Sequence, residues 1–127
     1  MGLRVGADIT RVDDVASSVV RFGDRYLQRL FTPHELASCT GSPSVMAASL
    51  AARFAAKEAT IKVLRPVDGA PGWRTIEVRQ HRSGWCDLHL TDEAAELAAE
   101  ADITELAVSL THEGAMAAAV VVAQCGR

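Results

Sequence analysis

The sequence is poor in several kinds of residue, and each shortage excludes a class of protein. Aromatic residues make up 5% of its 127 residues, so its core must be built from alanine, valine and leucine. The three cysteines, Cys39, Cys86 and Cys125, are far apart; this argues against a disulfide framework or a zinc site and favours the reducing cytoplasm. The formal net charge of -3 provides no basic field, so we expect no nucleic-acid partner.

The chain also lacks a long apolar run that is free of charge. Residues 45–64 have the length of a membrane span, about 20 residues, but Arg53, Lys57 and Glu58 lie at the centre of the run, where charges are costly in a bilayer. No secretory signal precedes Asp8, and the sequence has neither a G-x-S-x-G motif nor a P-loop. We therefore expect a single cytoplasmic domain over residues 1–127, with no membrane partner.

Cap and turn signals divide the chain into an α+β pattern. A strand is predicted over residues 3–9, and a helical period runs over 11–30 with a break at Gly23. A capping box, Thr32-Pro33-His34-Glu35, begins a short helix, and Ser42-Pro43-Ser44 begins a long one. A helix capped by Thr91 and four strands, over 75–81, 85–90, 103–111 and 115–124, complete helices packed on a mostly antiparallel sheet. The last strand is apolar on both faces, which predicts a central position.

The long helix carries an acid on its predicted buried face. On a helical wheel that face consists of Ala47, Leu50, Ala51, Phe54, Glu58 and Ile61. A buried carboxylate needs a cation, and Asp8, at the end of the first strand, is the strongest partner for sharing a divalent ion with Glu58. Mg²⁺ suits such a pair because it needs only one or two protein carboxylates. In the alternative interpretation Asp8 caps the next helix and Glu58 pairs with Lys62.

Two groups of basic residues suggest anionic ligands. Arg53, Lys57, Lys62 and Arg65 lie on or just after the long helix and would suit a polyphosphate, unless they form only a solvated helix flank. Arg21, Arg25 and Arg29 follow a four-residue spacing that Arg11 extends. They would dock an acidic partner or pair with Asp13, Asp14 and Asp24. His112 is predicted in a turn, where it would reach a ligand or have only a structural role.

Four ordered segments then identify a family. They are Val5-Gly6-Ala7-Asp8-Ile9, Phe31-Thr32-Pro33-His34-Glu35, the run Arg53 to Lys62 with its F-x-x-K-E-A-x-x-K element, and Val108-Ser109-Leu110-Thr111-His112-Glu113. Together they resemble the motifs of holo-[acyl-carrier-protein] synthase, the small type of 4′-phosphopantetheinyl transferase. The resemblance implies that fold, a homotrimer with active sites at subunit interfaces, and transfer of phosphopantetheine from coenzyme A to a serine of apo acyl carrier protein.

The resemblance also assigns roles to residues. Asp8 and Glu58 would bind Mg²⁺ and act with Lys57 in catalysis; Arg53, Lys57, Lys62 and His112 would hold coenzyme A. The helix with Arg11, Arg21, Arg25 and Arg29 would dock the carrier protein. The proton acceptor, Glu58 or a water on the metal, is left open, as is the pathway of the carrier.

Three segments depart from the family pattern. Residues 63–66 replace a glycine-rich turn, Gly84-Trp85-Cys86 replaces Gly-x-Pro, and Ala7 replaces the isoleucine that usually precedes the metal-binding aspartate. Three alternatives to phosphopantetheine transfer are open: a non-catalytic homologue that binds coenzyme A or a carrier protein, a structural or adaptor trimer, and a metal-dependent phosphohydrolase. Intact Asp8, Lys57, Glu58 and Lys62 argue against the first of these, and a phosphohydrolase usually needs more than two acids.

Overall fold

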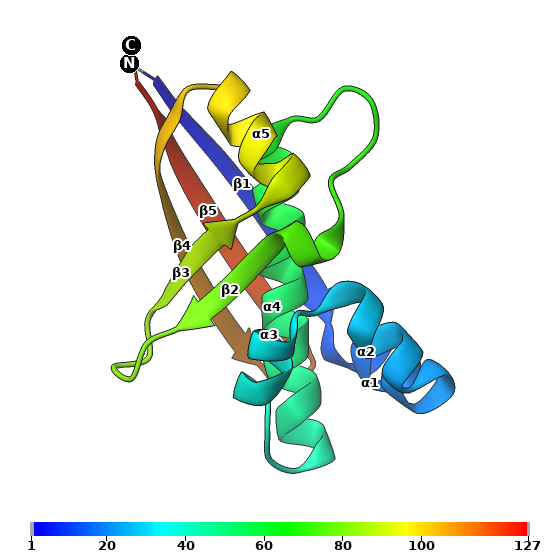
Figure 1. Cartoon of the computed structure of the whole chain (residues 1–127). Helices are drawn as coiled ribbons and strands as arrows, with labels where there is room; N and C mark the ends of the chain where they lie inside the picture. Colours follow the sequence, from blue (N-terminus) through cyan, green and yellow to red (C-terminus); the bar gives the residue numbers. More distant parts are fainter. Residues whose placement is uncertain (1, 127) are drawn as a thin grey trace.

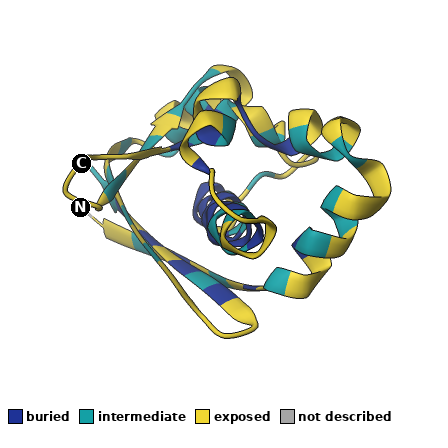
Figure 2. Cartoon of the chain, turned by 90° about the horizontal axis from the view of Figure 1, so that it is seen from below, coloured by how far each residue is buried: buried dark blue, intermediate teal, exposed yellow. Residues whose placement is uncertain are grey.

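A single long helix, α4 (Pro43–Leu64), forms the axis of the fold in the computed structural model, which describes residues 2–126. Figure 2 looks along this helix and shows the strands and the other helices arranged around it. One sheet has the order β1-β5-β4, formed by Gly2–Arg11, Met116–Cys125 and Ile103–Glu113. A second sheet pairs β2 (Ile76–Gln80) with β3 (Cys86–Leu90). All pairings are antiparallel, as predicted.

The helices begin and end close to the predicted signals (Figure 1). Gly23, with φ 58°, separates α1 (Val12–Phe22) from α2 (Asp24–Leu30). The capping box of α3 (Pro33–Ser38) is complete, with Glu35 N donating to Thr32 Oγ1 and Thr32 N donating to Glu35 Oε1. Ser42 caps α4 through Val45 N. Thr91 precedes α5 (Asp92–Glu100) but makes no side-chain cap hydrogen bond. A short 3₁₀ turn, η1 (Trp73–Thr75), leads into β2.

Helix α4 is buried on nearly all sides, which corrects the predicted apolar stripe. Phe54, Glu58 and Ile61 are only half-buried. Lys57 instead has 0% of its surface exposed and Arg53 has 5%. Ala47, Leu50 and Ala51 of the predicted stripe are buried. Because strands, loops and helices cover the helix all round, its apolar residues mark no single face.

Strand β5 is central, as predicted, but only one of its faces is covered within the chain. Ala117, Ala119, Val121 and Ala123 pack toward α4. On the opposite face of the sheet β1 exposes Leu3 (75%), Val5 (68%) and Ile9 (68%), and β5 exposes Val120 and Val122. We call these five residues the outer sheet face. An exposed apolar patch of this kind usually marks an interaction surface.

No helix among residues 2–126 is long and apolar enough to cross a membrane. The three cysteines are free thiols, with Cys39 buried.

Candidate functional site

Asp8, Glu58 and Lys62 come together where β1 crosses α4, and we call these three residues the carboxylate centre. Lys62 Nζ lies 3.3 Å from Asp8 Oδ1 and donates to the Ala7 carbonyl at 2.8 Å. Thr10 Oγ1 donates to Asp8 Oδ2 at 3.2 Å. Burial, and after it the negative charge of Asp8, raise the pKa of Glu58, so the two carboxylates are electrostatic neighbours.

These contacts exclude the alternative interpretation of the two acids. Arg11, not Asp8, is the N-cap residue of α1, and no side chain caps that helix. Lys62 pairs with Asp8 instead of Glu58. Strand β1 continues through Arg11, so Asp8 lies within the strand and not at its end.

Gly6 explains how the strand brings Asp8 so close to the helix. A Cβ atom at Gly6 would lie 2.2 Å from the Ala59 carbonyl oxygen, a distance that no side chain can adopt. Strand residues two positions apart share a face, so Asp8 points toward α4 as Gly6 does. Ala59 follows Glu58 directly. The Gly6-Ala7-Asp8 motif therefore combines a close backbone approach with an acid directed at the helix.

The carboxylate pair suits a hard divalent cation. Among residues 2–126 no cluster of three or more histidine, cysteine or acidic side chains could hold a metal, so a full protein cage is not built here. Mg²⁺ is commonly held by one or two carboxylates, with phosphate and water oxygens completing its coordination. Two adjacent carboxylates, one with a raised pKa, provide that donor set.

Replacing Glu58 by glutamine should stabilise the metal-free protein near neutral pH. Burial first, and then Asp8, raise the pKa of Glu58, while Lys62 lowers it. Between the unfolded and folded pKa values the native protein binds more protons, so its stability rises as pH falls through the folded pKa. The gain from Glu58→Gln should therefore shrink toward acid pH. Melting temperatures in EDTA between pH 5 and 8, with Glu105→Gln on exposed β4 as control, would test this; a gain that does not vary with pH contradicts it.

Lys57 lies outside the carboxylate centre, although the motifs predicted a role for it in catalysis and in binding coenzyme A. Its ammonium is fully buried and donates to Glu35 Oε1 at 2.8 Å, to the Trp73 carbonyl at 3.0 Å and to the Ile76 carbonyl. An ammonium has three donors, and all three are used within the protein. Burial lowers the pKa of Lys57, while the Glu35 carboxylate opposes this effect. Lys57 therefore ties α3, η1 and β2 to α4.

Arg53 and His112 lie together at a different place, a cavity of about 380 Å³ between α4, the β2–β3 hairpin and β4. Arg53 Nη2 donates to Gln80 Oε1 at 2.9 Å and Nη1 donates to the Ser49 carbonyl. Its Nε is buried and has no partner among the described residues. His112 lies in β4, paired with Ala117, and not in a turn as predicted. We call this space the arginine cavity.

The carboxylate centre and the arginine cavity lie on different sides of α4. Arg53 and Glu58 are five residues apart, which turns the helix by about 140°. Asp8 is on β1 and His112 on β4, the two edge strands on either side of β5. The predicted site residues are thus divided into two groups within one chain. Arg65 joins neither, since it caps the C-terminal end of α4 and lines another cavity.

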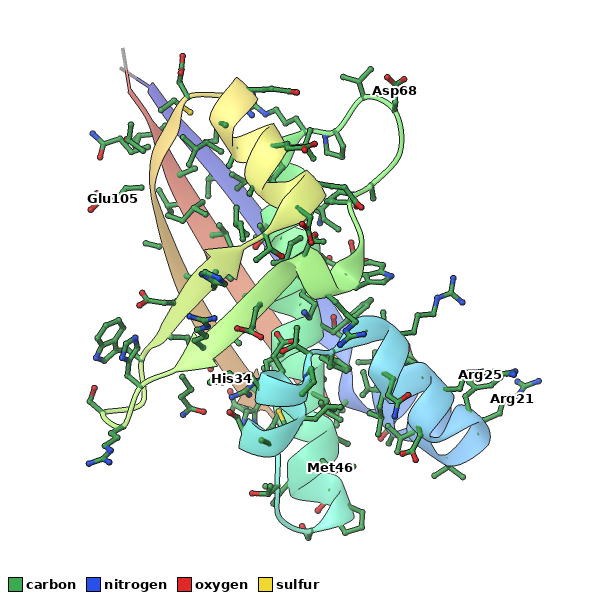
Figure 3. All side chains as sticks on the ribbon, viewed as in Figure 1. Arg21, Arg25, His34, Met46, Asp68 and Glu105 are labelled. Atoms are coloured by element: carbon green, nitrogen blue, oxygen red, sulfur yellow. The ribbon has the colours of Figure 1, made fainter. Side chains whose placement is uncertain are left out.

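The predicted basic stripe is also divided, because Gly23 breaks its helix. Figure 3 shows Arg21 and Arg25 side by side at the corner between α1 and α2, pointing away from the body. Both are exposed, next to exposed Val20 and Phe22, and no described residue forms an ion pair with them. Arg11 and Arg29 instead line a hollow with Asp14, Tyr26 and Trp73 among others.

The sequence analysis missed four residues that support these groups. Gly6 and Thr10 position Asp8, Glu35 neutralises Lys57, and Gln80 holds Arg53. Of these only Gly6 and Glu35 belonged to the quoted motifs. Glu35 was interpreted as a helix cap, which it is, but its second oxygen also accepts from Val78 N at 2.8 Å.

Comparisons with known proteins agree with the motifs. The model of the 4′-phosphopantetheinyl transferase superfamily matches residues 4–121. The holo-[acyl-carrier-protein] synthase of Chloroflexus aurantiacus is 41% identical, with 95% of this chain and 97% of that protein covered; that of Moorella thermoacetica is 42% identical, with 93% and 91% covered.

Solved structures show the same architecture. A Chronobacterium ammoniagenes ACPS–CoA complex superimposes with a TM-score of 0.87 at 30% identity, over 100% of both chains. The acyl carrier protein synthase of Mycobacterium tuberculosis gives a TM-score of 0.78 at 36% identity, over 98% of this chain and 100% of that one.

Proposed function

The chain belongs to the 4′-phosphopantetheinyl transferase superfamily, and we propose that its Asp8 and Glu58 hold the Mg²⁺ ion of a holo-[acyl-carrier-protein] synthase. It transfers 4′-phosphopantetheine from coenzyme A to a serine of apo acyl carrier protein, as the family resemblance of its motifs implied. The observation that carries the metal assignment is the close approach of β1 to Ala59 at Gly6, which places Asp8 near Lys62 and within electrostatic range of Glu58. A non-catalytic homologue would not need to keep both carboxylates, so their presence argues against that alternative.

The chemistry of transfer suits the carboxylate centre. The serine oxygen forms a bond to the β-phosphorus of coenzyme A, the bond from that phosphorus to the bridging oxygen breaks, and adenosine 3′,5′-bisphosphate leaves. Mg²⁺, when bound, supplies neutralisation of the phosphate charge. Glu58 is the side chain that we propose as acceptor of the serine proton, and a water on the metal is the alternative acceptor. Lys62 is half exposed and uses two donors, on Asp8 and Ala7, which leaves the third for a phosphate oxygen.

Coenzyme A is held on the other side by the arginine cavity. The buried guanidinium of Arg53 has an unpartnered Nε, and His112 lines the same space. A phosphate there would gain charge-assisted hydrogen bonds in a partly desolvated environment. Gln80 orients the guanidinium through its hydrogen bond with Nη2.

A homotrimer would bring the carboxylate centre of one chain and the arginine cavity of another into one active site. Within one chain the carboxylate centre and the arginine cavity lie on different sides of α4, and the outer sheet face is apolar and uncovered. Packing that face against other copies would bury Leu3, Val5 and Ile9 and would place the cavity of one chain near the carboxylate centre of the next. The family resemblance implies this arrangement, with active sites at subunit interfaces.

We further propose that residues 1–127 act as one domain in the cytoplasm. The buried clusters all pack around α4, which supports one folding unit. Three free cysteines are compatible with a reducing compartment.

The mass of a carrier protein tests the proposed activity directly. Apo acyl carrier protein is incubated with the protein, coenzyme A and Mg²⁺, and its mass should increase by one phosphopantetheine group. The same mixture with excess EDTA should leave the mass unchanged. No mass increase under any metal condition would contradict the function, and an increase in EDTA would contradict the metal requirement. Hydrolysis of coenzyme A without a modified carrier would favour the phosphohydrolase alternative.

Reversing Arg21 and Arg25 should impair recognition of the carrier protein but not of coenzyme A. Both residues are exposed beside Val20 and Phe22, and exposed charges act mainly through the rate of encounter with an acidic partner. Arg21→Glu with Arg25→Glu should raise the KM for carrier protein roughly tenfold at low salt, and by less at high salt, since the Debye length falls to about 8 Å at physiological ionic strength.

Kinetics with each substrate varied at two ionic strengths would check this. Arg65→Glu, at the opposite end of the fold, is the control for a general change in charge. Equal increases in both KM values would show that the two arginines have a structural role.

A further inference from the structure

The β2–β3 hairpin carries an exposed tryptophan in a chain that has only two. Trp85 is 57% exposed, although burying an indole would remove a large apolar area from water. The turn beneath it is closed by hydrogen bonds from His81 N to the Trp85 carbonyl and from Gly84 N to the His81 carbonyl. The exposed ring is therefore carried by a well-defined turn.

A neighbouring side chain fixes the plane of the indole. The His81 ring stacks on Trp85 with centroids 3.6 Å apart and an angle of 17° between the planes. His81 Nε2 in turn lies 2.9 Å from Asp87 Oδ2. These contacts hold Trp85 by one face of its ring. A rotamer that is fixed in advance loses little entropy when a ligand binds.

Trp85 also lines the arginine cavity, together with Arg53, Gln80, Cys86 and His112. Gly84 and Trp85 of the hairpin turn lie across this cavity from His112 of β4. The space thus has an aromatic ring on its wall and, at its inner side, a guanidinium that is 5% exposed and has an unpartnered Nε. Such a combination fits a ligand that has both a planar base and a phosphate.

We propose that Trp85 stacks on the adenine ring of coenzyme A while Arg53 binds the phosphate on the adjoining ribose. This rests on the proposed function, since coenzyme A carries these two groups next to each other. Trp85 stands where the family pattern has the variable position of Gly-x-Pro, so this contact belongs to this chain's own hairpin. Trp85 then determines affinity for the nucleotide end and takes no part in the chemical step.

Binding of adenosine 3′,5′-bisphosphate isolates this contact from catalysis. Stacking of one base is commonly worth about 1–3 kcal/mol, which corresponds to a five- to 150-fold change in affinity. Titration calorimetry should show that Trp85→Ala weakens binding by at least about fivefold. Trp85→Phe should retain most of the affinity because it keeps an aromatic face. Ser83→Ala, in the same turn, should bind as the wild type does.

Fluorescence provides a second readout. The wild type should show a change in tryptophan emission when the bisphosphate binds, and Trp85→Phe, which leaves Trp73 alone, should lose that change. In steady-state assays Trp85→Ala should raise the KM for coenzyme A while kcat and the KM for carrier protein stay the same.

Several results would overturn the inference. Three concern adenosine 3′,5′-bisphosphate: the wild type does not bind it, Trp85→Ala binds it as tightly as the wild type, or Ser83→Ala weakens its binding as much as Trp85→Ala does. The fourth is a change in the sedimentation of Trp85→Ala, which would place the indole between copies of the chain. Wild-type affinity in Trp85→Ala with normal transfer would reject this contact alone. A stacking contact in a protein that modifies no carrier would reject the proposed function and leave the contact standing.

Discussion

Asp8→Asn should abolish Mg²⁺-dependent transfer while the protein stays folded. The substitution keeps the size of the side chain and leaves an oxygen for Thr10 Oγ1, but it removes the charge shared with Glu58. A metal ion contributes several kcal/mol of charge stabilisation to the transition state, and each 1.36 kcal/mol is tenfold in rate. We therefore expect kcat to fall by at least about a hundredfold.

The measurements are the transfer rate, Mg²⁺ affinity by calorimetry, and the melting temperature in EDTA. Asp13→Asn, in the exposed first turn of α1, is the matched control. Removing the charge of Asp8 also removes a repulsion that raises the pKa of Glu58, so the metal-free variant should melt no lower than the wild type. Full Mg²⁺-dependent activity in Asp8→Asn would show that the carboxylate pair is not the metal site.

Those parts of the fold that depend on local signals could be predicted from the sequence. Thr32 and Glu35 close a capping box within four residues, and Gly23 ends a helix because it adopts a positive φ. Strand β5 was placed at the centre of its sheet because it is apolar on both faces. In each case the sequence signal lies within a few consecutive residues.

The orientation of α4 could not be predicted, because it depends on contacts far along the chain. A helix enclosed on all sides has apolar residues all round, so the helical wheel placed Glu58 toward the core, whereas Lys57 is the fully buried residue. The buried partner of Lys57 is Glu35, which is 22 residues away. Its other acceptors, the Trp73 and Ile76 carbonyls, belong to a loop and a strand that follow the helix. The motif K-E did not show which of its two charged residues is fully buried, and that residue is Lys57.

The two charged residues of that motif, Lys57 and Glu58, have different surroundings. Glu58 directly precedes Ala59, which β1 approaches at Gly6, and the charge of Asp8 acts on the Glu58 carboxylate. Lys57 lies about 100° around the helix from Glu58, and its ammonium donates to Glu35 of α3 and to the Ile76 carbonyl of β2. The buried Lys57–Glu35 ion pair ties α4 to α3 one residue before Glu58.

Lys57→Met should destabilise the protein by about 3–5 kcal/mol, because it leaves the Glu35 carboxylate buried without its cation. Total stability of a domain of this size is commonly about 5–15 kcal/mol, so the loss is large. Urea unfolding at 25 °C would measure it. Glu35→Gln, which keeps one oxygen to accept hydrogen bonds, is the milder variant, and the double variant should lose less than the sum of the two because the unpaired charge is gone.

The same variant distinguishes the buried role of Lys57 from the role that its motif suggested. If Lys57 held a phosphate of coenzyme A, Lys57→Met would raise the KM for coenzyme A and leave the urea midpoint unchanged. The three protein acceptors around its ammonium predict the reverse: a lower urea midpoint, with the KM for coenzyme A close to that of the wild type under conditions in which the variant is folded. Lys62→Met, at the exposed carboxylate centre, should show the opposite pattern, because its third donor is free for a phosphate and its removal uncovers no buried charge.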